Sequence, residues 1–233
     1  MSFLKFFGCG NAFSINEENT SAYFTIKDAF FLIDCGGTVF KKIIKKQLLV
    51  KYNSVYIILT HTHFDHIGSL GDFLLYLYFI KNIKPIIIFP DIDAIKNILH
   101  LCGIDDKIYQ IVKPSKNSYL INEYNLTIQY VRQNHIASLN CFGYIINFDN
   151  YRIFYSGDSR DINNYILDRF LSNEIQYFYQ DTCSYKNHLH LFIEDLFEYI
   201  PLNFRNKVYC MHYDDNLNHE WVIKNGFNIV KSI

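Results

Sequence analysis

The chain has 233 residues, half of them hydrophobic, and a net charge of -1, which is enough for one sizeable core but too neutral for a protein that coats nucleic-acid duplexes. No apolar run reaches the roughly 18 residues needed to cross a bilayer, and the first residues lack the order of a signal peptide. We therefore expect a single cytoplasmic domain over residues 1–233 with no membrane partner.

Short apolar strands dominate the first quarter of the chain. Residues 3–7, 22–26 and 30–33 form strand-like runs, and residues 39–49 have helical spacing with lysines on one side. Those lysines, at positions 41, 42, 45 and 46, indicate a solvated helix face more than a phosphate-binding patch. Residues 55–59 form a buried strand that leads directly into a histidine-rich stretch.

Helices and strands alternate through the rest of the chain. We expect helices at residues 70–80, 92–100, 164–171 and 193–199, the second of them capped by Asp91. We expect strands at residues 86–89, 108–112, 126–132, 144–148, 152–156, 177–181 and 208–211, with a hairpin turn at 149–150. This alternation favours an α/β fold in which helices cover layered sheets.

The stretch HTHFDH, residues 61–66, places four metal-binding side chains within six residues: His61, His63, Asp65 and His66. On a helix, histidines two positions apart would point in different directions, whereas at a strand end or in a tight loop they can converge. Imidazole and carboxylate groups suit Zn, Mn or Fe, with Zn as the default. One ion needs only three of these groups, so four close ligands predict two ions.

Three further ligand candidates stand downstream, each after an apolar strand: His135, Asp158 and His212. The carboxyl ends of strands in α/β sheets are the usual position of such sites. One carboxylate can give an oxygen to each of two ions, so Asp158 is the candidate for a bridging ligand.

Taken in order, HxHxDH, a lone histidine, a lone aspartate and a final histidine, these residues resemble the metallo-β-lactamase superfamily over nearly the whole chain. The segments GCGNAFSINEENTSAYF and FFLIDCGG are similar to the opening hairpins of its ribonuclease Z-like branch of small phosphodiesterases. The resemblance implies a four-layer αβ/βα sandwich, the metallo-β-lactamase fold. It places one divalent ion on His61, His63 and His135. It places the other on Asp65, His66 and His212, with Asp158 bridging the two.

The resemblance also implies two catalytic residues. Asp65 would orient a metal-bridging hydroxide besides binding one ion. A histidine shortly before the helix at residues 193–199 would act as general acid and protonate the leaving oxygen. The segment NHLHLF offers two candidates, of which His190 lies closer to the helix than the alternative, His188. Asp34, in LIDCGG, would fix the tautomer of a ligand histidine or simply form a turn.

Ribonuclease Z itself carries an arm that grips tRNA between the third histidine ligand and the bridging aspartate, but here His135 and Asp158 are only 23 positions apart. We therefore expect a metal-dependent hydrolase whose partner is a small phosphodiester, cyclic or nucleotide-linked, and not a nucleic acid. Hydrolases of esters, lactones or thioesters and nucleases acting on single-stranded RNA or DNA are the alternatives. A non-enzymatic metal-binding module is less favoured, because all seven ligands are intact. Homodimerisation, which is common in this branch, stays open.

Overall fold

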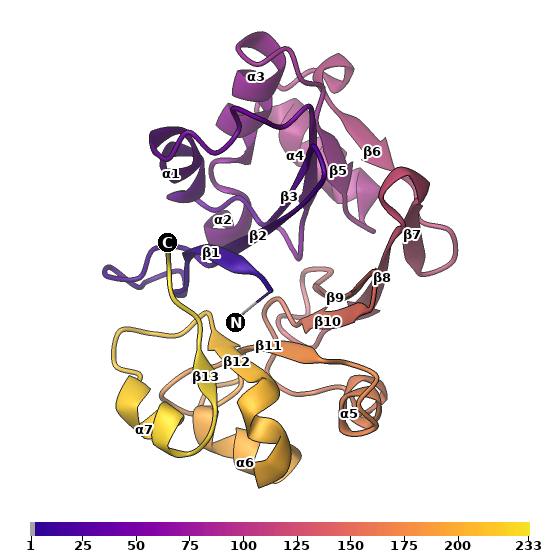
Figure 1. Cartoon of the computed structure of the whole chain (residues 1–233). Helices are drawn as coiled ribbons and strands as arrows, with labels where there is room; N and C mark the ends of the chain where they lie inside the picture. The colour runs from indigo at the N-terminus through magenta and orange to yellow at the C-terminus, as the bar shows by residue number, and fades with distance from the viewer. Residues whose placement is uncertain (1–2) are drawn as a thin grey trace.

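Two mixed β-sheets pack against each other in this computed structural model, which describes residues 3–233, and helices cover the outer face of each sheet (Figure 1). Buried apolar side chains from both sheets form one continuous core. For example, the ring centre of Phe6 in one sheet lies 5.7 Å from that of Tyr179 in the other. This is the four-layer αβ/βα sandwich that the resemblance implies, so the expected fold class is confirmed.

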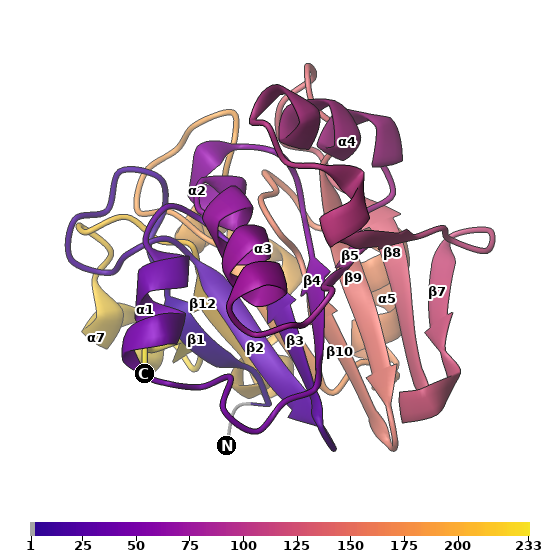
Figure 2. The ribbon, with the colours of Figure 1, turned by 90° about the horizontal axis from the view of Figure 1, so that it is seen from above.

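The first sheet contains, in spatial order, β1 (Lys5–Gly8), β2 (Ser21–Ile26), β3 (Ala29–Ile33), β4 (Ser54–Ile58), β5 (Ile86–Ile88) and β6 (Gln110–Val112). The first three are antiparallel, and the others run parallel to β3. β3 has the sequence AFFLI and is buried along its whole length, as expected of a strand covered on both faces. Figure 2 shows the helices in front of this sheet: α1 (Val39–Lys45), α2 (Phe64–Ile67), α3 (Leu70–Phe79) and α4 (Ile92–Leu101).

The second sheet contains β13 (Asn228–Ile229), β12 (Val208–Met211), β11 (Tyr177–Asp181), β10 (Tyr151–Tyr155), β9 (Phe142–Phe148), β8 (Leu126–Arg132) and β7 (Ser118–Ile121). β7 to β10 are antiparallel, and β10 to β13 are parallel. The covering helices are α5 (Asn164–Leu171), α6 (Leu196–Tyr199) and α7 (His219–Lys224). None of the helices formed by residues 3–233 is long and apolar enough to cross a membrane.

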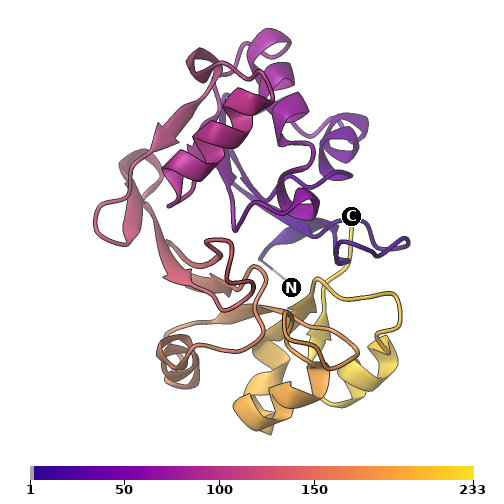
Figure 3. The same cartoon turned by 180° about the vertical axis from the view of Figure 1, so that it is seen from behind.

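In both sheets an antiparallel meander is followed by parallel strands, whose carboxyl ends lie at a common edge. Ile58 of β4 is in register with Ile33 of β3, and Asp181 of β11 with Met211 of β12. The residues that follow these strands therefore emerge side by side, as at sites in other α/β sheets. The carboxyl end of the chain returns to β1, where Ile233 N donates to Phe6 O at 2.9 Å, so the C-terminus lies beside the indigo strand β1 (Figure 3).

The differences between the expected and the observed elements have local causes. The helix expected over residues 39–49 ends at Lys45, because Gln47 adopts a left-handed backbone with a φ of 53°. The helix expected over residues 193–199 begins as a 3₁₀ turn, Ile193–Asp195, before α6. The sequence does not predict β7, α7 or β13, because these short elements lack the continuous apolar run that marks equally short strands such as β5 and β12.

Candidate metal centre

The HTHFDH stretch changes from extended chain to helix within three residues. His61 and His63 lie in extended chain after β4, and α2 then begins at Phe64 and carries Asp65 and His66. This turn requires the close approach of a glycine, since a Cβ on Gly36 would lie only 1.9 Å from Asp65 O. The strand end and the helix therefore present two pairs of side chains to neighbouring positions.

The three downstream ligand candidates follow strands as predicted. His135 follows β8, Asp158 follows β10, and His212 comes directly after β12. All three are buried, with 7%, 2% and 2% of their surface exposed. The fold thus gathers seven residues that are dispersed along the chain into one cluster between the sheets.

One group of ligand atoms joins His61, His63, His135 and Asp158. His63 Nδ1 lies 2.9 Å from His61 Nε2 and 3.4 Å from His135 Nε2. Asp158 Oδ2 lies 3.6 Å from His61 Nε2 and 3.6 Å from His135 Nε2. Ligands bound at roughly 2.1 Å around a tetrahedral ion stand roughly 3.4 Å apart, so this group fits one ion.

A second group joins Asp65, His66, His212 and the same Asp158. His66 Nε2 lies 3.3 Å from Asp65 Oδ2 and 3.2 Å from Asp158 Oδ1. His212 Nε2 lies 3.2 Å from Asp65 Oδ2 and 3.4 Å from Asp158 Oδ1. The two oxygens of Asp158 therefore face different groups, Oδ2 the first and Oδ1 the second.

Two of the atoms that the second group offers as ligands are buried and make no hydrogen bond within residues 3–233. They are His66 Nε2 and Asp158 Oδ1. A buried polar atom left unsatisfied costs roughly 1–3 kcal/mol, and the great majority of such atoms in proteins are satisfied. A divalent cation held between the two atoms would satisfy both, so the donor set fits a metal.

The electrostatics at His61 and Asp158 suit the role of metal ligand. Burial, followed by the charge of His66, lowers the pKa of His61 well below its ordinary value, so its imidazole is neutral, as a metal ligand must be. Burial opposes the ionisation of Asp158, but neighbouring imidazoles, led by His212, outweigh it and hold the pKa of this carboxyl well below its ordinary value. Asp158 therefore stays charged despite its burial.

Asp34, directly after β3, orients two ligand candidates through their Nδ1 atoms, directly or through Thr60. Its Oδ2 lies 2.9 Å from His66 Nδ1 and accepts a hydrogen bond from Thr60 Oγ1 at 2.8 Å. Thr60 Oγ1 in turn lies 3.0 Å from His61 Nδ1. The Nδ1 atoms of both histidines are engaged, so their Nε2 atoms face the metal groups. Of the two interpretations of Asp34, the geometry favours the one that fixes tautomers.

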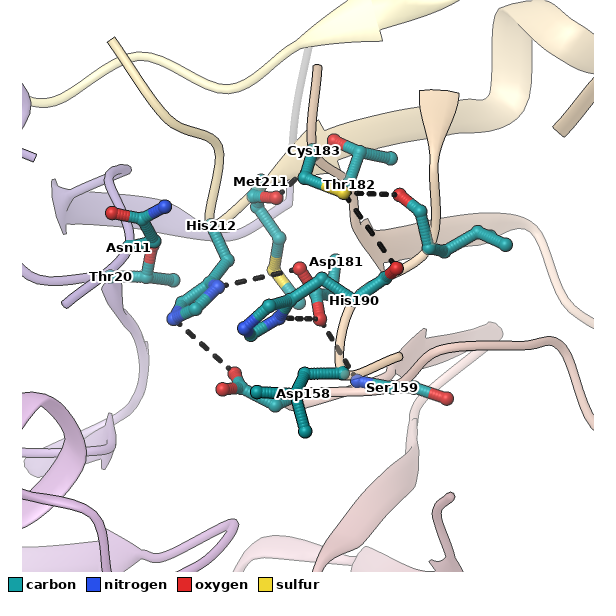
Figure 4. A network of polar contacts seen from close by, with 12 residues as sticks. Asn11, Thr20, Asp158, Ser159, Asp181, Thr182, Cys183, His190, Met211 and His212 are labelled. Atoms are coloured by element: carbon teal, nitrogen blue, oxygen red, sulfur yellow. Dashed lines mark hydrogen bonds and ion pairs between the residues drawn. The ribbon is translucent and has the colours of Figure 1, made fainter. Parts of the chain in front are cut away.

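Asp181, the last residue of β11, holds two further histidines, although the sequence does not mark it as functional. Its Oδ2 lies 2.7 Å from His190 Nδ1, and its Oδ1 lies 3.3 Å from His212 Nδ1 (Figure 4). Oδ2 also accepts a hydrogen bond from Ser159 N at 2.9 Å. One carboxylate thus connects a ligand candidate with the candidate general acid. The sequence feature that could have indicated Asp181 is its position at the end of an apolar strand, which resembles the position of Asp34 directly after one.

Of the two histidines in NHLHLF, His190 is the one that lines the site. Its ring centre lies 5.0 Å from that of His135 and 5.0 Å from that of His212. His188 is exposed and does not line the pocket above the cluster. Burial lowers the pKa of His190, but the Asp181 carboxylate outweighs it and raises this pKa above its ordinary value. His190 is therefore suited to carry a proton near neutral pH.

The cluster opens into a pocket of about 670 Å³, a volume typical of small-molecule sites. Ligand candidates and His190 line its inner part, and loop residues 11–13, 185, 187 and 189 line its mouth. The α1 lysines do not line it, and Lys42 is paired with Glu18. The position of these lysines agrees with a solvated helix face.

Three solved structures have the same fold. The metallo-β-lactamase fold protein YhfI from Bacillus subtilis matches with a TM-score of 0.74 at 18% identity, covering 98% of this chain and 96% of that one. The short form of human tRNase Z matches with a TM-score of 0.67 at 17% identity, covering 91% and 93%. A diphosphatase from the PhnP family matches with a TM-score of 0.76 at 13% identity, covering 98% and 94%. At these identities the likeness shows the fold alone, which is the metallo-β-lactamase fold.

Sequence comparison identifies the family. An anti-Pycsar protein Apyc1 of Bacillus phage vB_BsuM-Goe3 is 29% identical, covering 96% of this chain and 93% of the relative. That of Paenibacillus harenae is 23% identical, covering 92% and 91%. The family profile of anti-Pycsar protein Apyc1 matches residues 2–232. With this match over almost its whole length, the chain, which has the metallo-β-lactamase fold, belongs to the anti-Pycsar protein Apyc1 family.

Proposed function

We propose that this protein is a binuclear metal-dependent phosphodiesterase that hydrolyses small phosphodiesters, cyclic or nucleotide-linked. The observation that carries the proposal is the position of Asp158, whose two oxygens face two separate groups of ligand atoms. Two-metal sites of this kind recur among phosphatases and nucleases, where they act on both the attacking and the leaving oxygen.

We assign one ion to His61, His63 and His135. We assign the other to Asp65, His66 and His212, with Asp158 shared between the two. Their imidazole and carboxylate groups favour Zn, with Mn and Fe as alternatives. Two bound ions would supply a water-derived nucleophile near neutral pH and would neutralise charge on the phosphoryl oxygens.

His190 is placed to donate a proton to the leaving oxygen. Its Nδ1 is bonded to Asp181, so Nε2 is the atom available on the pocket side. The Asp181 carboxylate stabilises the protonated imidazole and holds the plane of its ring. Asp65 lines the same pocket, and its Oδ2 lies 3.2 Å from His212 Nε2. We propose that Asp65 orients the nucleophile besides binding metal.

The shape of the site favours a small substrate over tRNA. The β9–β10 hairpin fills the chain between His135 and Asp158, where ribonuclease Z would carry its arm. A pocket of about 670 Å³ has room for a nucleotide. Two of the structural neighbours are named as a tRNase and a diphosphatase, names that refer to phosphate-bearing substrates.

Turnover of bis-para-nitrophenyl phosphate by the Zn- or Mn-loaded protein tests this proposal. We expect hydrolysis that is abolished by a chelator and by Asp65→Ala. Asp72→Ala is the matched control, because it removes an exposed carboxylate from α3, outside the pocket. Two bound ions without phosphodiester cleavage would contradict the proposal and direct the assay to esters, lactones and thioesters. A protein that binds no metal would also contradict the proposal.

We also propose that residues 1–233 act as one domain in the cytoplasm on a small-molecule substrate. The continuous core between the two sheets supports the single domain. Phe79 and Ile80 at the end of α3 are 65% and 68% exposed, and they would be covered in a homodimer. Sedimentation of wild type and of Phe79→Ser would distinguish the dimer from a monomer.

A further inference from the structure

Three exposed aromatic side chains surround the mouth of the catalytic pocket. Phe13, Phe64 and Tyr185 are 88%, 83% and 52% exposed, and all three line the pocket. A single exposed aromatic residue is ordinary, but three from separate segments at one opening mark a binding surface. Phe64 stands between two ligand candidates, whereas Phe13 and Tyr185 belong to two loops remote from them in sequence.

The loop that carries Phe13 is held in place by a carboxylate from the other end of the chain. Asp215 accepts hydrogen bonds from Ser14 Oγ, from Ile15 N at 3.1 Å and from Asn16 Nδ2 at 3.3 Å. The side chain of Asn11 accepts a further bond from Phe13 N at 3.0 Å. The exposure of Phe13 is therefore built into an anchored loop.

The segment that carries Tyr185 is anchored in the same manner. Asp214 accepts hydrogen bonds from Ser184 N at 2.8 Å and from Ser184 Oγ at 2.7 Å. Asn187 Nδ2 donates to Tyr185 O at 3.3 Å. Both loops lie at the side of the molecule where α2 is found (Figure 2). Asp214 and Asp215 directly follow the strand end that presents His212, so one short stretch fixes both loops relative to the ligand cluster.

We propose that Phe13 and Tyr185 form the walls of a subsite that stacks on the nucleobase of the substrate, and that Asp214 and Asp215 are positioning residues for these walls. This inference rests on the proposed function, because the subsite takes the base only if the phosphodiester lies on the ligand cluster. A planar heteroaromatic ring stacks on aromatic side chains through its faces. The amide of Asn187 and the carbonyl oxygen of the Asn11 amide are occupied by backbone contacts, so stacking is the interaction that the two aromatic walls offer a base.

The test compares kcat/KM for a 3′,5′-cyclic nucleotide with kcat/KM for the same cyclic ribose phosphate without a base. We expect the wild type to prefer the nucleotide by roughly 10-fold, as stacking of one base supplies. Phe13→Ala should lose most of this preference, through KM, and Phe13→Trp should retain it. Ile15→Ala is the matched control, because Ile15 is equally exposed at 88% on the same loop but does not line the pocket.

The outcomes separate this inference from the function on which it rests. Hydrolysis of both substrates with equal kcat/KM in the wild type, or an unchanged preference in Phe13→Ala, would overturn the subsite and leave the phosphodiesterase standing. Hydrolysis of neither substrate would overturn the subsite, and failure to cleave bis-para-nitrophenyl phosphate as well, by protein that binds two ions, would overturn the phosphodiesterase.

The positioning role of Asp215 has its own readout. We expect Asp215→Ala to raise KM for the nucleotide several-fold while kcat is retained, because the ligand cluster is untouched. If Asp215 acts through Phe13, the double variant should be no worse than Phe13→Ala alone. Additive effects of the two substitutions, or a loss confined to kcat, would contradict this role.

Discussion

Asp34 and Asp181 are both fully buried carboxylates at strand ends, and each holds two histidines from behind. Asp34 contacts His66 directly and reaches His61 through a threonine hydroxyl. Both of these histidines are ligand candidates, so Asp34 serves metal binding alone. Asp181, in contrast, holds one ligand candidate and the candidate general acid, so it couples metal binding to proton transfer.

The electrostatic states of the two carboxylates differ accordingly. Burial raises the pKa of Asp34 above its ordinary value, because the contact with His66 offsets the lost hydration only in part. Burial acts in the same direction on Asp181, but His190 and His212 outweigh it and lower the pKa of this carboxyl. Two carboxylates in similar positions thus have different roles, which are set by the histidines that they contact.

Removal of Asp158, which belongs to both groups of ligand atoms, has the largest expected effect. Asp158→Ala should lower kcat by about 1,000-fold, because the Lewis-acid contribution of a metal is worth several kcal/mol. Mass spectrometry of the native protein should also show fewer bound ions. Asp168→Ala, on the exposed face of α5, is the control. Retention of both ions and of full turnover in Asp158→Ala would refute its bridging position.

The role of His190 is tested by changing the leaving group. His190→Ala should lower kcat about 100-fold, the lower end of what a general acid contributes, for a substrate that expels an alkoxide, such as a cyclic nucleotide. The loss should be much smaller for para-nitrophenolate, which leaves without a proton. Equal losses on the two substrates would show that His190 does not act as the acid.

The same assay should distinguish the roles of Asp34 and Asp181. Asp34→Asn and Asp181→Asn should each weaken metal binding about 10- to 100-fold, as found for groups that orient ligand histidines. At saturating metal, the kcat of Asp181→Asn on the alkoxide substrate should still be reduced, whereas the kcat of Asp34→Asn should return to that of the wild type. If the two variants behave alike with both leaving groups, the distinction drawn between these carboxylates is wrong.

The pH dependence of kcat sharpens the same distinction. His190 must be protonated to donate, so activity on an alkoxide substrate should fall as pH rises through its pKa, which Asp181 holds above the ordinary value of about 6.5. Asp181→Asn should move this alkaline limb to lower pH, whereas Asp34→Asn should leave it in place. If kcat falls over the same alkaline pH range in the two variants, the coupling of Asp181 to His190 is contradicted.

The smallest effect is expected for the second histidine of the NHLHLF segment. His188 is exposed and lies outside the pocket, so His188→Ala should change kcat by less than about two-fold on either substrate. A loss comparable to that of His190→Ala would reassign the general acid.

The ligand candidates could be predicted from the sequence because each belongs to the histidine motif or follows an apolar strand, and the fold brings them together. Asp181 could not be separated in this way from other strand-end aspartates, because its role depends on His190 and His212, which only the fold places beside it. Phe13 lies in a polar loop whose path is set by Asp215, about 200 residues away. Elements with a continuous apolar run or a long periodic pattern were predictable, whereas β7, α7 and β13, which have neither, were not.

The most direct test of the binuclear site is a stepwise addition of Zn to the metal-free protein while hydrolysis of bis-para-nitrophenyl phosphate is followed. We predict that activity rises until about two equivalents are bound per chain, and that Asp158→Ala never reaches this plateau. A maximum at one equivalent, or full turnover before any metal is added, would contradict the binuclear mechanism.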